Sequence, residues 1–476
     1  MIQRAMVVLP AALVWVGHAA VACRAEERPA GQPAVVEPAA CIQVVEQGTG
    51  WPVPLVALRT NHQVSFWTDN AGVVAIDLPE LMGRETWFSV SADGYEVPAD
   101  GFGFRGVRWT PKPGAVLRVE VTRTQIAKRL GRITGGGLFA ESQKLGRERD
   151  WPESGVLGCD SVQVAVHRGK RFWAWGDTTL ACYPLGIFHM TSATTSLQPL
   201  DSFEPPLKLK FDYFTDAEGR PRGVAEMPGD GPTWVSGYTS LPDATGDERL
   251  VGTYVKIKPP LEAYECGLCV WDDEGQQFER LRTVWTKSEV APDQPLMPSG
   301  HPVLLTADDG KTWVLFGDPL PRLRCAATFE AWQDPANWQP LEPQATLAAA
   351  GGGDGARIKP HSGSIAWNAF RRRWVTVFME AFGKPSAFGE LWYAEADSPY
   401  GPWGPAVKIL SHANYTFYNP RIHAELTPAD SPILLFEGTY TQMFADRPPP
   451  TPRYDYNQVM YRLDLDDPQL APAQTK

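Results

Sequence analysis

The chain has 476 residues, of which 43% are hydrophobic and 21% are charged; this balance excludes an intrinsically disordered protein, and the length predicts two or more domains. Its formal net charge of −11 argues against a nucleic-acid partner, because binding a phosphate backbone requires clustered lysine and arginine side chains. The 43 glycines, 44 prolines and 18 tryptophans predict short strands separated by many turns, and therefore an all-β fold.

Residues 1–25 have the pattern of a secretory signal peptide. Arg4 precedes an apolar run over residues 5–16, and small residues follow as far as Ala22. We therefore expect a secreted protein, released or held in the periplasm or at the cell surface. The run is too short to span a membrane and no later run reaches about 18 apolar residues, so no membrane span is expected. The residues before Cys23 weakly resemble a bacterial lipoprotein box, which leaves a lipid anchor at Cys23 as the alternative to ordinary cleavage.

Residues 26–40 are rich in proline and are expected to form a linker. In an exported protein disulfides can persist, and Cys159 with Cys182 is a plausible bridge between neighbouring strands, although the sequence leaves the pairing open. Cys266 and Cys269 form a Cys-x-x-Cys pair, which invites a metal or redox interpretation. Alternation along a strand would point their sulfurs to opposite faces, so we expect no metal site and no cofactor.

Residues 41–123 alternate short β-like runs with turns, which predicts a small β-sandwich. Three of its motifs resemble those of the carboxypeptidase regulatory-like, transthyretin-like domains: Thr49-Gly50-Trp51-Pro52-Val53-Pro54, Thr68-Asp69-Asn70-Ala71-Gly72 and Ser89-Val90-Ser91-Ala92-Asp93-Gly94-Tyr95. The resemblance implies a non-catalytic accessory domain. Residues 124–150 are expected to connect it to the rest of the chain, with a short helix over 125–130 and a flexible glycine junction at 135–137.

Residues 151–470 repeat one pattern, a pair of short strands around a turn that ends in aromatic residues and a carboxylate. The first copy runs from Asp160 to Thr178, and the same order of apolar, aromatic and acidic residues returns at 312–318, 374–380 and 433–437. Five such repeats predict a five-bladed β-propeller, so the expected fold is all-β, a small N-terminal β-sandwich followed by a five-bladed β-propeller. The last repeat lacks its fourth strand, and we expect residues 133–140 to supply it and close the ring.

Two motifs carry a resemblance to a known group of enzymes. They are Trp175-Gly176-Asp177-Thr178 and the strand Gly389-Glu390-Leu391-Trp392-Tyr393-Ala394-Glu395 with its continuation Ala396-Asp397-Ser398-Pro399-Tyr400-Gly401-Pro402-Trp403. With the five repeats, they resemble the clan of propeller glycosidases that contains arabinanases, xylosidases and invertases. The resemblance implies a glycoside hydrolase whose partner is a polysaccharide or oligosaccharide. The sequence lacks the Asn-Asp-Pro-Asn-Gly and Arg-Asp-Pro motifs of invertases, so an invertase-type activity is not supported.

In a propeller the first strand of each blade lines the central channel, and the starts of these strands gather around one mouth. Polar residues at the starts of apolar strands are therefore candidates for sugar binding. Each of them has an alternative role, which is to satisfy a loop or a neighbouring backbone group. The predicted substrate-binding residues are His301, His361, Ser362, Asn419, Arg421 and His423. Most aromatic residues of the chain are expected to be core between blades, but seven are further candidates for stacking on sugars: Trp175, Tyr183, Trp234, Tyr415, Phe417, Tyr418 and Tyr440.

Glycoside hydrolysis requires one carboxylic acid to protonate the leaving oxygen and a second carboxylate to act as base or nucleophile. Arabinanase-like enzymes place an aspartate base on blade one, an orienting aspartate and a glutamate acid. By position, the resemblance implies Asp160 as the base, with Asp177 as an alternative or as its orienting partner, and Glu390 as the acid, ahead of Glu437 and Glu380. The acids that end the second strands have another explanation, because their carboxylates could accept backbone N–H groups of a nearby turn. That set is Asp177, Asp318, Glu380 and Glu437.

Two other classes of function fit the same sequence. A lectin-like or cell-surface binding module would hold glycan at the same mouth by hydrogen bonds and stacking, without cleaving it. A structural surface protein would use the N-terminal sandwich as a tether and leave the mouth narrow. The sequence leaves open the sugar, the linkage, the retaining or inverting outcome and the oligomeric state.

Overall fold

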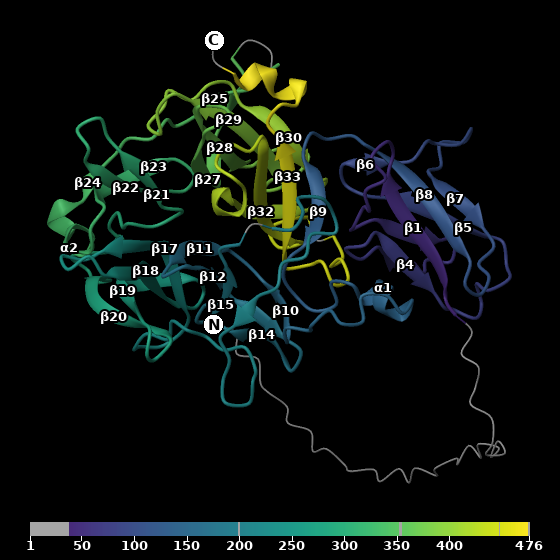
Figure 1. The fold of residues 1–476 in the computed structure, drawn as a ribbon, viewed down its shortest axis with the longest axis horizontal. Helices are drawn as coiled ribbons and strands as arrows, with labels where there is room; N and C mark the ends of the chain where they lie inside the picture. Colours follow the sequence, from purple (N-terminus) through teal and green to yellow (C-terminus); the bar gives the residue numbers. More distant parts are fainter. Residues whose placement is uncertain (1–37, 199, 352–354, 447, 475–476) are drawn as a thin grey trace, which may run out of the picture. The chain divides into compact units, whose positions relative to one another are not determined.

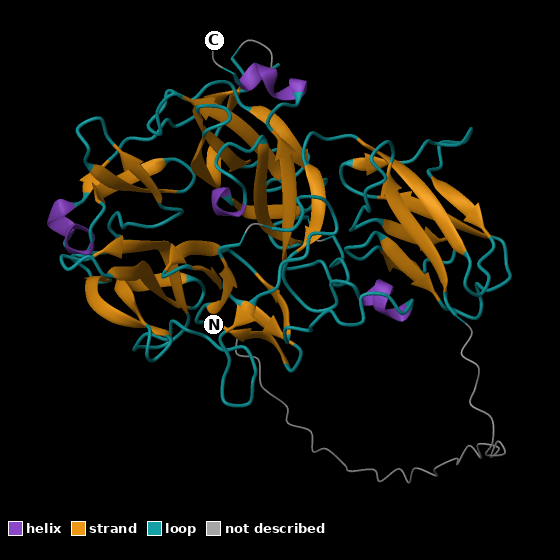
Figure 2. Cartoon of the chain, in the orientation of Figure 1, coloured by secondary structure: helices purple, strands orange, loops and turns teal. Residues whose placement is uncertain are grey.

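The computed structural model describes residues 38–198, 200–351, 355–446 and 448–474. The predicted signal peptide, Cys23 and most of the predicted linker lie outside these residues. Strands dominate the described part of the chain, and helices are short: α1 Ala140–Lys144 and α2 Phe329–Trp332, with the 3-10 turns η1 Pro335–Asn337, η2 Ala424–Leu426 and η3 Pro468–Ala473 (Figure 2). Among the described residues, no helix is both long enough and apolar enough to cross a bilayer.

The N-terminal domain is a β-sandwich of two four-stranded sheets. The first has the order β4 Val73–Ile76, β1 Ala40–Glu46, β8 Val116–Arg123 and β6 Tyr95–Glu96. The second has the order β3 Ser65–Trp67, β2 Ala57–Thr60, β5 Thr86–Ser91 and β7 Gly106–Trp109. Their apolar inner faces share one buried core that includes Val44, Leu58, Val74 and Phe88. Two four-stranded sheets around one shared apolar core confirm the predicted sandwich.

Five four-stranded antiparallel sheets follow one another around a ring (Figure 1). Blade 1 is β11 Gln163–His167, β12 Lys170–Trp175, β15 Thr191–Ser196 and β16 Asp212–Tyr213; blade 2 is β17 Thr233–Pro242, β18 Glu248–Lys258, β19 Glu262–Asp272 and β20 Gln277–Thr286. Blade 3 is β21 Val303–Thr306, β22 Thr312–Gly317, β23 Pro321–Ala326 and β24 Gln339–Pro340; blade 4 is β27 Pro360–Asn368, β28 Arg373–Glu380, β29 Glu390–Ala396 and β30 Val407–Ser411. Blade 5 is β31 Thr416–Ile422, β32 Ile433–Thr441, β33 Asn457–Asp464 and β9 Lys128–Arg132. The small hairpin β25 Leu347–Ala348 with β26 Arg357–Ile358 precedes blade 4.

The strand that closes the ring is β9, which pairs antiparallel with β33 through Arg132↔Val459 and Lys128↔Arg462. The predicted helix over 125–130 is therefore wrong. A strand that precedes blade 1 does close the ring, as predicted, but it lies at 128–132 rather than at 133–140. Residues 128–132 have no apolar alternation to mark them as a strand, and their conformation is fixed by pairing with a segment more than 300 positions away. The segment assigned as a connector thus contributes one strand to the propeller.

Each blade buries both of its faces against its neighbours. On β19, Cys266 packs with Val314 and Phe316 of blade 3. Cys269, three residues later, packs with Phe172 of blade 1, so the two sulfurs lie on opposite faces of the strand as pleating predicts. The plausible Cys159–Cys182 bridge is not formed, because Cys159 is buried, Cys182 is exposed and both are free thiols.

Arg129 of β9 is fully buried and its guanidinium is held by groups from several segments. Nε donates to the Tyr461 hydroxyl at 3.0 Å, Nη1 to the Pro54 carbonyl at 3.1 Å and Nη2 to the Asp93 carbonyl at 2.7 Å. Removing the guanidinium would leave these buried acceptors without a donor, which is expensive in a low-dielectric interior.

We predict that Arg129→Ala lowers the free energy of unfolding by about 3–5 kcal/mol, because it leaves buried polar groups unsatisfied and opens a cavity. Urea denaturation followed by circular dichroism measures the change. Arg118→Ala is the matched control, because this side chain is 52% exposed and pairs weakly with Glu120; we expect a change within about 0.5 kcal/mol. Equal effects of the two substitutions would contradict a special role for Arg129.

Candidate functional site

The candidate site lies on what we call the mouth face, the face of the ring at which the first strand of each blade begins. The second strand runs antiparallel to the first, so it ends on the same face. Residues before β11, β17, β21, β27 and β31, and residues after β12, β22 and β28, therefore meet there. The predicted carboxylates Asp160 and Asp177 belong to this set.

A small extra sheet fixes Asp160 beside Asp177. Its strands are β10 Val156–Cys159, β13 Thr178–Leu180 and β14 Tyr183–Ile187, in that order. Cys159 pairs with Thr178, so Asp160 and Asp177 occupy the next position of the antiparallel ladder. The Gly176 amide also donates to the Asp160 carbonyl at 2.8 Å. The first strand of blade 1 begins at Gln163 rather than at Asp160, and the acid stands in the turn that precedes it.

Asp160 is partly buried and bonded to tyrosine hydroxyls from blade 5. Its Oδ2 accepts a hydrogen bond from Tyr418 at 2.6 Å, and Tyr456 also donates to the carboxylate. Oδ1 lies against Gly176, where a Cβ atom would overlap it, so the turn requires glycine. Burial, and next the like charge of Asp177, raise the pKa of Asp160 to about 6 against the opposing effect of the tyrosine hydrogen bonds.

Three of the four repeated acids end the second strands as predicted, and each accepts one hydrogen bond. Asp177 accepts the Trp234 indole N–H at 2.9 Å, and burial raises its pKa. Glu380 accepts the Trp392 indole N–H at 2.8 Å. Asp318 accepts the Gly363 amide at 2.6 Å, which confirms for this residue the alternative that the acids satisfy backbone N–H groups. Asp177 and Asp318 thereby join neighbouring blades.

Asp318 stands on blade 3, which is not adjacent to blade 1 in the ring. Its side chain is exposed to solvent, so a ligand on the mouth face can reach it. Desolvation by the surrounding protein nevertheless raises the pKa of Asp318 to about 7, more than the Gly363 hydrogen bond and the charge of Arg322 lower it. Asp160 and Asp318 are thus two carboxyl groups of the mouth face that titrate near neutral pH.

Glu390 and Glu437 are not brought into this group. Glu390 is fully buried in the third strand of blade 4, with Oε2 2.7 Å from Lys408 Nζ and Oε1 2.9 Å from Ser411 Oγ. Glu437 is fully buried in the middle of β32, opposite Arg421, and does not end its strand as its three counterparts do. β32 continues because Gly438 to Thr441 go on pairing with both neighbouring strands.

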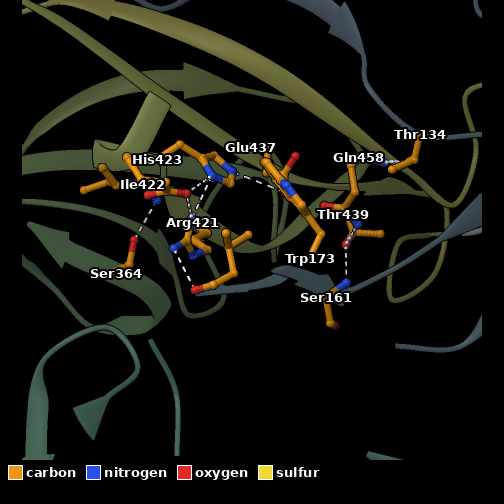
Figure 3. Close-up of polar contacts among 12 residues, drawn as sticks. Thr134, Ser161, Trp173, Ser364, Arg421, Ile422, His423, Glu437, Thr439 and Gln458 are labelled. Carbon is orange, nitrogen blue, oxygen red and sulfur yellow. Dashed lines mark hydrogen bonds and ion pairs between the residues drawn. The ribbon is translucent and has the colours of Figure 1, made fainter. Parts of the chain in front are cut away.

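Arg421 and His423 form a network inside the ring rather than an accessible site (Figure 3). Arg421 Nη1 donates to Glu425 Oε1 at 2.7 Å, and its Nη2 donates to the Val164 carbonyl at 3.2 Å. His423 Nδ1 is 2.9 Å from Glu425 and its Nε2 is 3.3 Å from Glu437. His301 is buried near them, and burial with the charges of Arg421 and His423 lowers the pKa of His301 to about 3.

The other predicted binding residues are Asn419, which contacts Ser161 beside Asp160, and the consecutive His361 and Ser362. Asn419 Nδ2 donates a hydrogen bond to Oγ of Ser161 at 2.6 Å, and Ser161 directly follows Asp160 in the chain. Both residues have left-handed backbone, with φ 49° at Ser161 and φ 50° at Asn419, a strain that is common at functional sites. His361 is exposed and Ser362 is buried, with a hydroxyl that finds no hydrogen-bond partner in the described part of the chain.

Sequence reasoning missed Tyr456 as a hydrogen-bond donor to Asp160, because the loop that contains Tyr456 has no repeating pattern. It also overestimated the accessible aromatic residues, since Trp175 and Phe417 are fully buried between blades. A cavity of about 900 Å³ lies elsewhere, lined by residues such as Trp151 and Arg171, and includes none of the predicted site residues. In the described part of the chain, no three histidine, cysteine or acidic side chains are grouped so that they could hold a metal ion.

Comparison with known proteins gives similarities of structure. No protein-family model and no curated protein matches the sequence. Among solved structures, an exo-1,5-α-L-arabinanase from a bovine ruminal metagenomic library is 11% identical over 65% of this chain and 93% of its own, with a TM-score of 0.37. The GH43_1 enzyme from Xanthomonas citri is 10% identical over 71% and 90%, with a TM-score of 0.37. An arabinanase from Bacillus subtilis is 10% identical over 64% and 96%, with a TM-score of 0.34.

The raised pKa of Asp160 predicts a specific dependence of stability on pH. Its folded pKa of about 6 lies above the ordinary 3.8, so the native state loses stability as pH rises from about 4 to about 6. Asp160→Asn removes the ionisation, and we expect it to be more stable than the wild type by about 2–3 kcal/mol at pH 8. The difference should shrink between pH 6 and pH 4, where the wild-type carboxyl is neutral.

Urea denaturation of both proteins at several pH values measures this difference. Asp308→Asn, at an exposed position, is the matched control for the removal of one carboxylate, and its stability should follow the same pH profile as that of the wild type. A constant difference between wild type and Asp160→Asn from pH 4 to pH 8 would contradict the raised pKa.

Proposed function

We propose that the protein is a secreted glycoside hydrolase that cleaves a polysaccharide or oligosaccharide on the mouth face, with Asp160 as the base or nucleophile and Asp318 as the acid. The observation that carries the proposal is the pair of raised pKa values, about 6 at Asp160 and about 7 at Asp318, on two blades of one face. Glycoside hydrolysis needs one carboxyl group that is ionised and one that still holds a proton at the same pH.

The chemistry assigns a role to each group. Asp318 gives its proton to the glycosidic oxygen as the bond from that oxygen to the anomeric carbon breaks. Ionised Asp160 either takes a proton from the attacking water or attacks the anomeric carbon itself, according to the distance between the carboxyl groups across the bound sugar. Tyr418 holds the Asp160 carboxylate in place, and the neighbouring charge of Asp177 keeps it basic.

Asp318 takes the role that the sequence suggested for Glu390. A proton donor must touch the leaving oxygen, and the Glu390 side chain has no exposed surface. Both of its oxygens are already bonded, to Lys408 and Ser411. Asp318 has a free oxygen and an exposed side chain, which favours it as the acid.

A glycan-binding protein without hydrolytic activity is the second candidate. It is favoured by the hydrogen bonds that Asp177 and Asp318 make to neighbouring blades, because these bonds give both acids a structural reason to be present.

The proposal that the protein is secreted is supported by the signal-peptide pattern of residues 1–25. The sandwich fits an accessory domain of the carboxypeptidase regulatory-like type, which would hold the propeller near its substrate.

We predict that Asp160→Asn and Asp318→Asn each lower polysaccharide hydrolysis by about 10²- to 10⁴-fold, the usual contribution of a general acid or base. Release of reducing ends from arabinan, xylan, galactan and inulin measures the activity. Glu390→Gln is the control and should retain it, provided that circular dichroism shows an intact fold. Loss of activity in Glu390→Gln with full activity in Asp318→Asn would reverse the assignment of the acid, and no hydrolysis by the wild type would favour the binding protein.

The dependence of kcat/KM on pH gives a second prediction. The rate should rise through about pH 6 as Asp160 ionises and fall through about pH 7 as Asp318 loses its proton, so the optimum is narrow. Tyr418→Phe removes a hydrogen bond that stabilises the ionised carboxylate, and the rising limb should move to higher pH. On an aryl glycoside whose leaving group needs no proton, Asp318→Asn should lose the falling limb. Limbs that stay unchanged in both variants would contradict these roles.

A further inference from the structure

Aromatic side chains form a continuous cluster on the mouth face, which we call the aromatic platform: the exposed Phe382, Phe444 and His361, the half-buried Phe388 and the buried Tyr418. Phe382 is 75% exposed and Phe444 is 60% exposed, which is unusual for rings of this size. Phe388 links them, with ring centroids 5.3 Å from Phe382 and 6.2 Å from Phe444. His361, predicted to bind substrate, lies 5.2 Å from Phe388.

The two loops that carry the exposed phenylalanines of the platform have a strained backbone conformation. Phe382 and Phe444 have φ values of 57° and 63°, a region that bulky side chains rarely adopt. The first loop is tied to blade 5 by the Phe417 amide, which donates to the Phe388 carbonyl at 2.8 Å. The second is tied by the Thr416 hydroxyl, which donates to the Met443 carbonyl. These hydrogen bonds maintain a strained backbone although the rings stay exposed to solvent. Such strain does not help the protein to fold, so it points to a role in binding a ligand.

The platform is continuous with the acid site through Tyr418. Its hydroxyl bonds Asp160 at 2.6 Å, and its ring centroid is 5.8 Å from that of Phe444. The interplanar angles within the platform are 49° for Phe382–Phe388 and 85° for Phe388–Phe444, so the rings do not cover one another's faces by stacking. Free aromatic faces suit the C–H groups on the apolar side of a sugar ring, as they suit other flat or apolar groups.

We propose that the aromatic platform binds sugar units of a carbohydrate chain next to the bond that is held at Asp160. This inference rests on the proposed function for its ligand class, and it adds the subsite and the residues that make it. A chain long enough to reach both Asp160 and the platform should bind more tightly than a short one. Blades 4 and 5 would therefore set the preference for polymer over small glycosides.

Affinity electrophoresis in gels that contain arabinan, xylan, galactan or inulin tests the platform without requiring hydrolysis. We use the Asp160→Asn protein so that the polymer is not cleaved, and compare it with the same protein carrying Phe382→Ala, Phe444→Ala or both. Each substitution should weaken binding about 3- to 10-fold and the double substitution by more. Phe370→Ala is the matched control, because Phe370 is 43% exposed in the turn that ends β27, away from the mouth face.

The outcomes separate this inference from the proposed function. If the wild type hydrolyses none of the polymers, and retardation is seen but is lost in the double variant, the platform is supported and the hydrolase is refuted. Hydrolysis by the wild type with retardation unchanged in the double variant overturns the platform and leaves the hydrolase standing. Absence of retardation in all four gels also overturns it. In the active protein the double substitution should raise KM for the retarding polymer more than it raises KM for an aryl glycoside, which is too short to reach the platform.

Discussion

The pairing of β9 with β33 is the interaction on which the rest of the propeller depends. If the ring of blades stayed open, one strand edge and one blade face would be exposed to water. Closing the ring covers both. The seam is reinforced by Thr134, whose hydroxyl bonds Asn457 at 3.0 Å, and by Gln458, which donates to the Cys159 carbonyl at 3.1 Å. Figure 3 shows Thr134 and Gln458 with Thr439, whose hydroxyl accepts the Ser161 amide. Closure thereby fixes blade 5 as the neighbour of blade 1.

The acid site is a consequence of that seam. Asp160 and Ser161 come from the start of blade 1, and Tyr418 and Asn419, which bond them, come from the start of blade 5, 258 positions later. The tyrosine supplies both the hydrogen bond and part of the burial that set the pKa of Asp160. Asp318, on blade 3, does not depend on the seam. It lies on the same face because it follows the second strand of its blade, and the second strand of each blade ends at the mouth face.

The sequence predicted what depends on local repetition and missed what depends on distant pairing. β28 and β32 are apolar and aromatic runs, and their pattern identified them as strands. β9 has the sequence Lys-Arg-Leu-Gly-Arg, and only its partner makes it a strand. Asp177 and Asp318 could be placed because they follow a strand, whereas Glu437 could not, because the strand continues past it. The ion pair of Glu390 with Lys408 depends on the register of β29 with β30, which no sequence motif records.

Charge compensation separates the two groups of polar residues that the propeller holds. In the interior network, burial is opposed by Arg421 and His423, which lower the pKa of Glu425, so the charges satisfy one another and contribute to the fold. On the mouth face, Asp160, Asp177 and Asp318 keep raised pKa values that oppose folding above neutral pH. Strained backbone at Ser161, Asn419 and Tyr456 gathers around the same acids. Stability alone would favour asparagine for such acids and glycine for such turns, so the mouth face has features that selection for folding does not explain and that selection for chemistry on a ligand does.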